Sequence, residues 1–171
     1  MAETGTNDAI ALLKSDHRAV EELFGQFQGT SGERRKQKLA HDICLALSVH
    51  AQIEEEIFYP ACKGRVDDDT LKEGYVEHDA AKLLIAEIEA NEEGDDDFFD
   101  AKVHVLQEQI EHHIKEEEKR MEGLFAQARK AGLDTDALGQ ELAARKEELT
   151  RRFEASGIPA PQLKTMDEVS V

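Results

Sequence analysis

The residues of this sequence that could carry chemistry are histidines and glutamates on helical faces where apolar residues would be expected. In HAQIEEE, His50 and Glu54 lie four positions apart, and in HIKEEE, His113 and Glu117 repeat that spacing in the same order. Four positions make about one helical turn, so each pair occupies one face of its helix. Imidazoles and carboxylates placed in this way are typical ligands of a transition-metal ion.

Two further histidines, His17 and His78, fall on the apolar stripes of two other predicted helices. A buried carboxylate is costly unless a cation compensates it, and no Lys or Arg shares the stripe of either glutamate. Lys82, one turn past His78, is the only cation near the set. Bound metal resolves the conflict, and the two repeated pairs predict two ions with the carboxylates bridging them. The predicted ligands are His17, His50, Glu54, His78, His113 and Glu117.

A single inward histidine is more often a hydrogen-bonded core residue, but four of them meeting two glutamates have no comparable explanation. His41, His104 and His112 fall outside the inner stripes and are predicted to lie at the surface. Mixed imidazole and carboxylate ligands suit iron, manganese, zinc or copper. The paired arrangement favours iron, and the His-x-x-x-Glu order differs from the Glu-x-x-His order of ferritin-type sites.

Four amphipathic helices must position these ligands, because apolar residues recur at steps of three and four along four stretches separated by short polar breaks. We expect an all-α fold, an antiparallel up-down four-helix bundle. The fourth helix is predicted to carry Met121 and Leu124 on its inner face. The helices are expected at about 8–28, 33–60, 70–91 and 97–132.

One domain accounts for the length, since single domains commonly have roughly 100–200 residues. Residues 1–132 are predicted to form the bundle and residues 133–155 an additional C-terminal helix packed on its outside, with Arg145 interrupting the apolar stripe. Residues 156–171 contain two of the three prolines and little periodic apolar content, which predicts a flexible tail.

Composition excludes some classes of partner. The chain has 21 Lys and Arg against 38 Asp and Glu, and its net charge of -17 repels phosphate backbones and anionic membrane surfaces. We expect no nucleic-acid or membrane partner. The sequence shows no signal peptide, which favours a cytoplasmic location. Cys44 and Cys62, about 27 Å apart on one predicted helix, cannot bridge each other.

Four segments resemble those of the hemerythrin-like (HHE cation-binding) family over roughly residues 8–127: SDHRAVEELF, HAQIEEEIFYP, EHDAAK and IEHHIKEEE. The resemblance implies that the four histidines and two glutamates hold a non-haem di-iron centre, oxo- or hydroxo-bridged. Such a centre would take dioxygen, nitric oxide or peroxide. Zinc and manganese stay open as alternative metals.

Dioxygen-carrying members of that family use a further histidine one turn before the equivalent of His78, and here that position is Gly74. Two neighbours are predicted to contribute to small-molecule binding at the open site. Tyr75 shares the face of His78 and is the better placed, with a hydrogen-bonding core phenol as the alternative role. Glu77 is turned about 100° away, which favours an outer-sphere or solvent-facing position.

The leading expectation is a protein that binds or senses dioxygen or a related small molecule. One alternative is a di-iron enzyme that scavenges peroxide or nitric oxide, or repairs iron-sulfur clusters. Another is a helical interaction module with a structural metal and an unknown protein partner.

Overall fold

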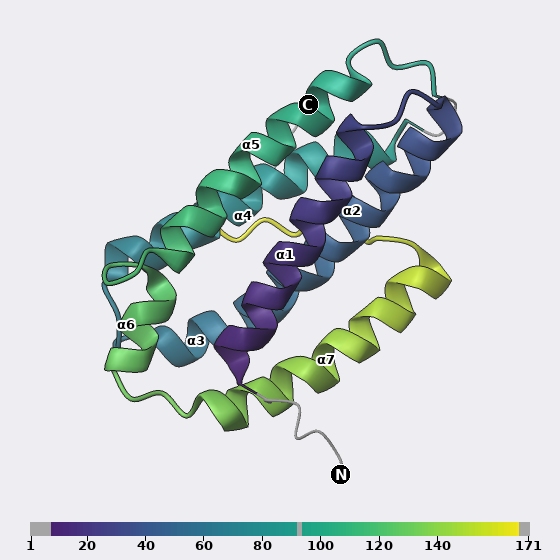
Figure 1. Ribbon diagram of the computed structural model, residues 1–171. Coiled ribbons are helices and arrows are strands. Elements are labelled where there is room, and N and C mark those ends of the chain that lie inside the picture. The colour runs from purple at the N-terminus through teal and green to yellow at the C-terminus, as the bar shows by residue number, and fades with distance from the viewer. Residues whose placement is uncertain (1–7, 92–93, 168–171) are drawn as a thin grey trace.

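The computed structural model describes residues 8–91 and 94–167, and within these ranges every regular element is a helix. Five helices are long, and Figure 1 shows their arrangement. They are α1 (Ala9–Gln28), α2 (Glu33–Ile53), α4 (Asp68–Glu89), α5 (Phe99–Glu118) and α7 (Thr135–Ser156). The shorter elements are the π-helical turn η1 (Glu54–Phe58), α3 (Tyr59–Cys62) and α6 (Leu124–Lys130).

Three of the long helices begin at aspartate caps that the sequence encodes. The carboxylates of Asp8, Asp67 and Asp134 accept hydrogen bonds from backbone N–H groups three residues ahead, at 2.9–3.0 Å. These bonds satisfy donors that have no partner within the helix, and the negative charge suits the helix N-terminus.

Four helices enclose the core: α1 packs on α2, α2 on α4, α4 on α5, and α5 on α1. The core consists of two apolar clusters, one around α3, α6 and the first turn of α1, and the other around the second half of α1 and most of α5. On α1, His17 lies between Leu13 of the first cluster and Val20 of the second. The candidate metal-binding residue on α1 therefore lies at the boundary between the two apolar clusters.

The fourth predicted helix is shorter than the sequence indicated. It ends at Glu118 instead of near Gly132, and α6 follows as a separate element. The chain turns sharply back at Gly123, where a Cβ atom would lie 2.6 Å from the backbone of Glu117 and Lys119. Met121, predicted to face the core, is 84% exposed in this turn.

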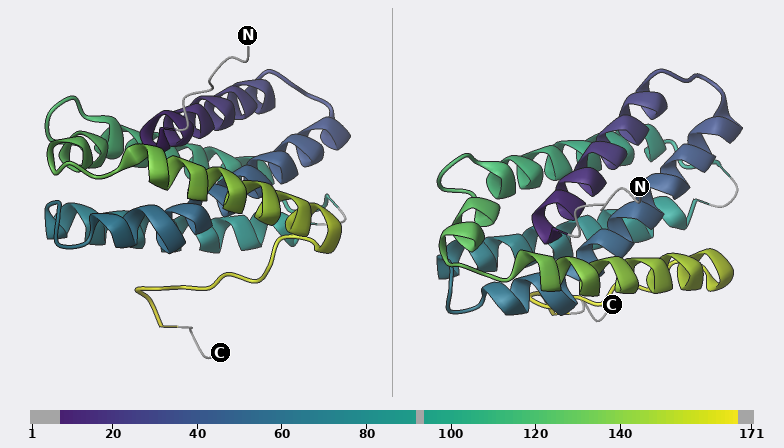
Figure 2. Two further views of the ribbon diagram at one scale, coloured as in Figure 1. Left: turned by 90° about the horizontal axis from the view of Figure 1, so that it is seen from below. Right: turned by 60° about the horizontal axis from the view of Figure 1, so that its bottom comes forward.

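The C-terminal helix α7 lies against α1 and α2, as Figure 2 shows. It buries Leu142, Leu149 and Phe153. Arg145, which interrupts the apolar stripe, forms a two-pronged ion pair with Glu56, at 2.7 and 3.1 Å. This pairing explains how a charged residue is accommodated on the packed side of the helix.

After α7 the chain reverses direction and runs back in extended form (Figure 2). The sequence predicts a flexible tail here, whereas residues 158–165 make specific contacts with the helices. Backbone N–H groups of Lys164 and Thr165 donate to the carboxylate of Asp79, which is fully buried. Residues 168–171 of the predicted tail lie outside the described residues.

No helix within residues 8–91 and 94–167 is long and apolar enough to cross a membrane. Cys44 and Cys62 are both buried free thiols.

Candidate metal centre

The six predicted ligands come together in the interior, and each is at most 7% exposed. Their donor atoms form two groups, and within each group the atoms lie within 4.8 Å of one another. One group is His17, His50 and Glu54, and the other is Glu54, His78, His113 and Glu117. Glu54 belongs to both groups, so one carboxylate joins two potential metal positions.

The donor atoms are close to each other without forming hydrogen bonds. The Nε2 atom of His50 lies 3.1 Å from Oε1 of Glu54, yet neither atom has a hydrogen-bond partner. Both Nε2 of His113 and Oε2 of Glu117 are likewise unpartnered. Buried polar atoms are normally paired, so lone pairs that converge without bonding each other fit a cation between them.

The other ring nitrogen of each histidine faces a carboxylate. Such a carboxylate accepts the Nδ1 proton, fixes the tautomer and leaves the Nε2 lone pair directed inward, as is usual for metal-binding histidines. These hydrogen bonds are 3.0 Å from His50 to Asp16, 3.1 Å from His78 to Glu55 and 3.4 Å from His113 to Glu77. Nδ1 of His17 lies 3.5 Å from Glu118 but makes no hydrogen bond.

Without metal, protons must balance the buried carboxylates. Burial disfavours the charged form of His50, but Glu54 and Asp16 outweigh it and raise the pKa of His50 to about 10. Burial is likewise outweighed at His113, whose pKa Glu117 and other carboxylates raise well above the usual value. Burial and the neighbouring His50 lower the pKa of His17 to about 4. The site thus carries protons that a metal ion would replace.

Tyr59 is a residue at the centre that sequence reasoning missed. Its hydroxyl donates to Oε1 of Glu117 at 2.9 Å and lies 3.3 Å from Nε2 of His78, on whose ring the phenol stacks. In a regular α-helix Tyr59 would be turned about 140° from Glu54. The π-helical turn, with the Tyr59 N–H bonded to the carbonyl of Glu54, brings the two onto one face.

Gly74 leaves the space that the Tyr59 phenol fills. A Cβ atom at Gly74 would lie 2.9 Å from the Tyr59 hydroxyl oxygen, closer than side chains tolerate. The position that the resemblance associates with a further histidine is therefore occupied by a phenol from another helix. A glycine inside a helix, opposite an aromatic residue in FYP, is the signal that could have indicated this.

The two residues predicted near the open site lie further out. Tyr75 is half-buried and packs its ring edge-on against Tyr59, with centroids 5.0 Å apart. Glu77 faces Nδ1 of His113 and so lies outside the ligand atoms. The remaining histidines are exposed, as predicted: His41, His104 and His112.

Known proteins share the sequence pattern and the fold of this chain. The family described as Hemerythrin HHE cation binding domain matches residues 8–125, more than half of the chain. A crystal structure of a hemerythrin HHE cation binding domain-containing protein from Mycobacterium kansasii superposes with a TM-score of 0.72. It is 19% identical and the match covers 88% of this chain and 94% of that one. At this identity the likeness shows the fold alone.

A protein named DNA nickase from Nostoc sp. (strain PCC 7120) is 27% identical over 144 residues. The match covers 83% of this chain and 40% of that protein, so the chain spans less than half of this relative. Because the family model matches more than half of the chain, including all six candidate ligands, the chain belongs to the hemerythrin HHE cation-binding domain family.

Proposed function

We propose that the protein holds two iron ions in an antiparallel four-helix bundle and uses them to bind or sense dioxygen, nitric oxide or peroxide. The observation that carries the proposal is the sharing of Glu54, whose two oxygens have no hydrogen-bond partner, between two groups of buried donor atoms. A carboxylate has two oxygens and can bridge two cations, which a single-ion site would not require. Zinc and manganese fit the same donor types, and elemental analysis of the purified protein would distinguish them from iron.

The two metal positions would differ in their protein ligands. His17 and His50 serve one position, and His78 and His113 serve the other, with Glu54 common to both. Glu117 belongs to the second group, and its Oε2 lies 3.8 Å from Nε2 of His17. When bound, the metal pair would supply open coordination positions and electron transfer to the small molecule.

Tyr59 would set the polarity at the second position. Burial and the nearby Glu117 raise the pKa of Tyr59 well above the usual value, so the phenol keeps its proton. It can therefore donate a hydrogen bond to Glu117 or to an oxygen atom placed beside His78. This donor makes the second position the one that favours an oxygen-containing ligand.

Optical titration tests the proposal. Ferrous protein prepared without oxygen is mixed separately with dioxygen, nitric oxide and peroxide. We expect a visible-spectrum change that saturates at one small molecule per metal pair and is lost in Glu54→Ala/Glu117→Ala. Recovery of the starting spectrum after dioxygen is removed supports binding or sensing. Irreversible oxidation supports an enzyme instead, and an unchanged spectrum with every ligand contradicts the proposal.

A further inference from the structure

A cavity of about 880 Å³ lies between α2, α4, α7 and the extended segment after α7. It reaches four of the six candidate ligands: His17, His50, His78 and His113. A water molecule takes roughly 30 Å³ in the liquid, and dioxygen is of comparable size. Sites for organic ligands usually have roughly 300–1,000 Å³, so this cavity is on the scale of a carbon skeleton.

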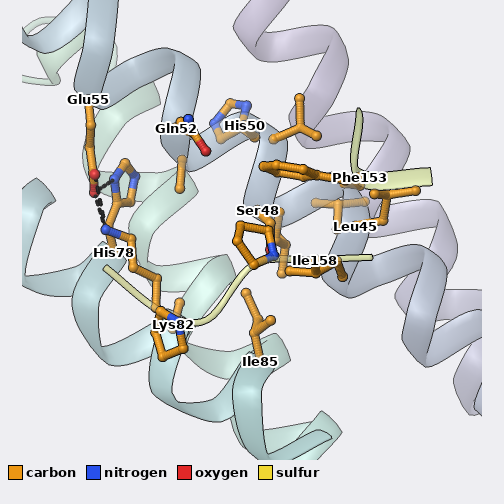
Figure 3. Close-up of a pocket in the computed structure, with 18 of the residues that line it drawn as sticks. Leu45, Ser48, His50, Gln52, Glu55, His78, Lys82, Ile85, Phe153 and Ile158 are labelled. Carbon is orange, nitrogen blue, oxygen red and sulfur yellow. Dashed lines mark hydrogen bonds and ion pairs between the residues drawn. The ribbon is translucent and has the colours of Figure 1, made fainter. Parts of the chain in front are cut away.

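The wall of the cavity is mainly apolar between its mouth and the histidines. Its inner part is formed by side chains of the second core cluster: Val20, Leu47, Ile85, Ile110 and Ile114. Figure 3 shows Phe153, Ile158 and Ile85 around the space, together with His50 and His78, two of the candidate ligands. A bound molecule would therefore meet hydrocarbon along its length and the imidazole rings of candidate ligands at one end.

The outer wall is residues 157–165, which we call the C-terminal strap. Ile158, Pro159, Ala160 and Pro161 of the strap line the cavity. The prolines contribute no N–H donors, so this stretch presents few polar groups to the space behind it. Ile158 and Pro161 are half-buried and cover part of the outer side of the cavity, while Pro159 and Ala160 are exposed.

The strap is anchored beyond the cavity at one buried carboxylate. Asp79 is 0% exposed and accepts from the N–H of Lys164 at 3.0 Å and from the N–H and hydroxyl of Thr165, both at 2.7 Å. Lys82 donates to the carbonyl of Gln162 at 2.9 Å. These bonds hold the far end of the strap across the mouth of the cavity.

The anchor is linked to the metal centre by a short chain of polar contacts. Lys82 also pairs with Glu55 at 2.9 Å, and Glu55 accepts from Nδ1 of His78 at 3.1 Å. Dashed lines in Figure 3 mark these contacts. One lysine thus contacts both the strap and the carboxylate that orients a candidate ligand, which places the mouth of the cavity beside the metal centre.

We propose that the cavity binds an aliphatic molecule with an oxygen-donor head group, with its chain along the apolar wall and its head at the metal centre. The proposal rests on the proposed metal function, because a metal ion is what would accept the head group. The cavity beside the candidate metal-binding residues is far larger than dioxygen needs, and an aliphatic molecule of this class would fill it.

The test is calorimetric titration of metal-loaded and metal-free protein with n-alkyl carboxylates from butanoate to decanoate, and with the matching alcohols. Affinity of the loaded protein for the carboxylates should rise about fourfold per methylene until the cavity is filled. Metal-free protein should bind the alcohols as the loaded protein does and the carboxylates much more weakly, because the cation that would accept the carboxylate head group is absent. Affinity that does not change with chain length, or no binding at all, overturns the proposal.

Two substitutions on α4 provide the control. Ala86 and Ala80 are both half-buried, but only Ala86 lines the cavity. Ala86→Phe should weaken decanoate binding about fifteenfold, the effect of displacing roughly two methylenes, and Ala80→Phe should leave it unchanged. Equal losses in both variants contradict the cavity as the binding site.

Metal content and optical spectrum, recorded on the same samples, separate the two proposals. If the protein holds two metal ions per chain but binds no alkyl compound, the proposed cavity site is wrong and the proposed metal function stands. Chain-length-dependent alcohol binding in a protein that takes up no metal overturns the proposed metal function and supports the cavity.

Discussion

Glu54 is the residue on which the candidate centre depends most. It is 0% exposed and belongs to both groups of donor atoms. Burial opposes its charge, but His50, His113 and His78 lower its pKa well below the usual value, so it is a carboxylate even without metal. A carboxylate between two sets of imidazoles offers one negative charge that two bound cations could share.

Gly74 and Tyr59 are complementary, which a substitution can test. Gly74→Ala should lower the free energy of unfolding by about 1 kcal/mol, because overpacking against Tyr59 outweighs the helix propensity that alanine gains. In a Tyr59→Phe background the loss should be smaller, since the hydroxyl is the nearest atom. Urea denaturation of the four proteins measures this, and equal losses in both backgrounds contradict the assignment.

Metal affinity should rise with pH. The pKa of His50 is about 10 in the metal-free protein, so between about pH 6 and 8 this ring carries a proton that the metal must displace. Each displaced proton raises apparent affinity about tenfold per pH unit. Zinc titration with a competing chelator at several pH values measures the slope, and a slope of zero contradicts protonated ligands.

The same proton affects stability in the opposite direction. Because folding raises the pKa of His50 from 6.5 to about 10, the proton stabilises the metal-free fold fully below about pH 6.5. That contribution falls as pH rises and is lost above about pH 10. Metal-free protein should therefore lose stability over the range in which metal affinity increases.

At the scale of elements, hydrophobic periodicity located α1, α2 and α4 and placed all six candidate ligands on inner faces. It could not find Tyr59, because a π-helical turn breaks the regular 3.6-residue repeat between Glu54 and Tyr59. It also extended α5 past Glu118, because the apolar spacing continues into α6 while Gly123 turns the chain. The path of the strap depends on Asp79, whose role only tertiary contacts reveal.

The α7 helix should unfold together with the other helices. Leu149 is fully buried between α7 and the first core cluster, so Leu149→Ala should cost about 2–5 kcal/mol in a single urea transition. Leu138→Ala, half-buried on the same helix, should cost less. A separate early transition, with the metal retained, would show that α7 is only loosely attached.

At the scale of the whole molecule, two apolar clusters flank one polar layer in a chain of net charge -17. Cations bound in that layer would offset buried charge and link all four helices that supply ligands. Ligand binding to the folded state raises stability by about 4 kcal/mol at a thousandfold excess over Kd. Metal is thus expected to determine much of the stability of the fold.

Counting metal ions per chain by elemental analysis tests the shared-carboxylate centre most directly. The folded protein should hold two iron ions, His17→Ala should retain one, and Glu54→Gln should lose both because its carboxylate serves both positions. Circular dichroism should show that all three proteins remain helical. A single ion in the unchanged protein, or two ions retained in folded Glu54→Gln, would contradict the account.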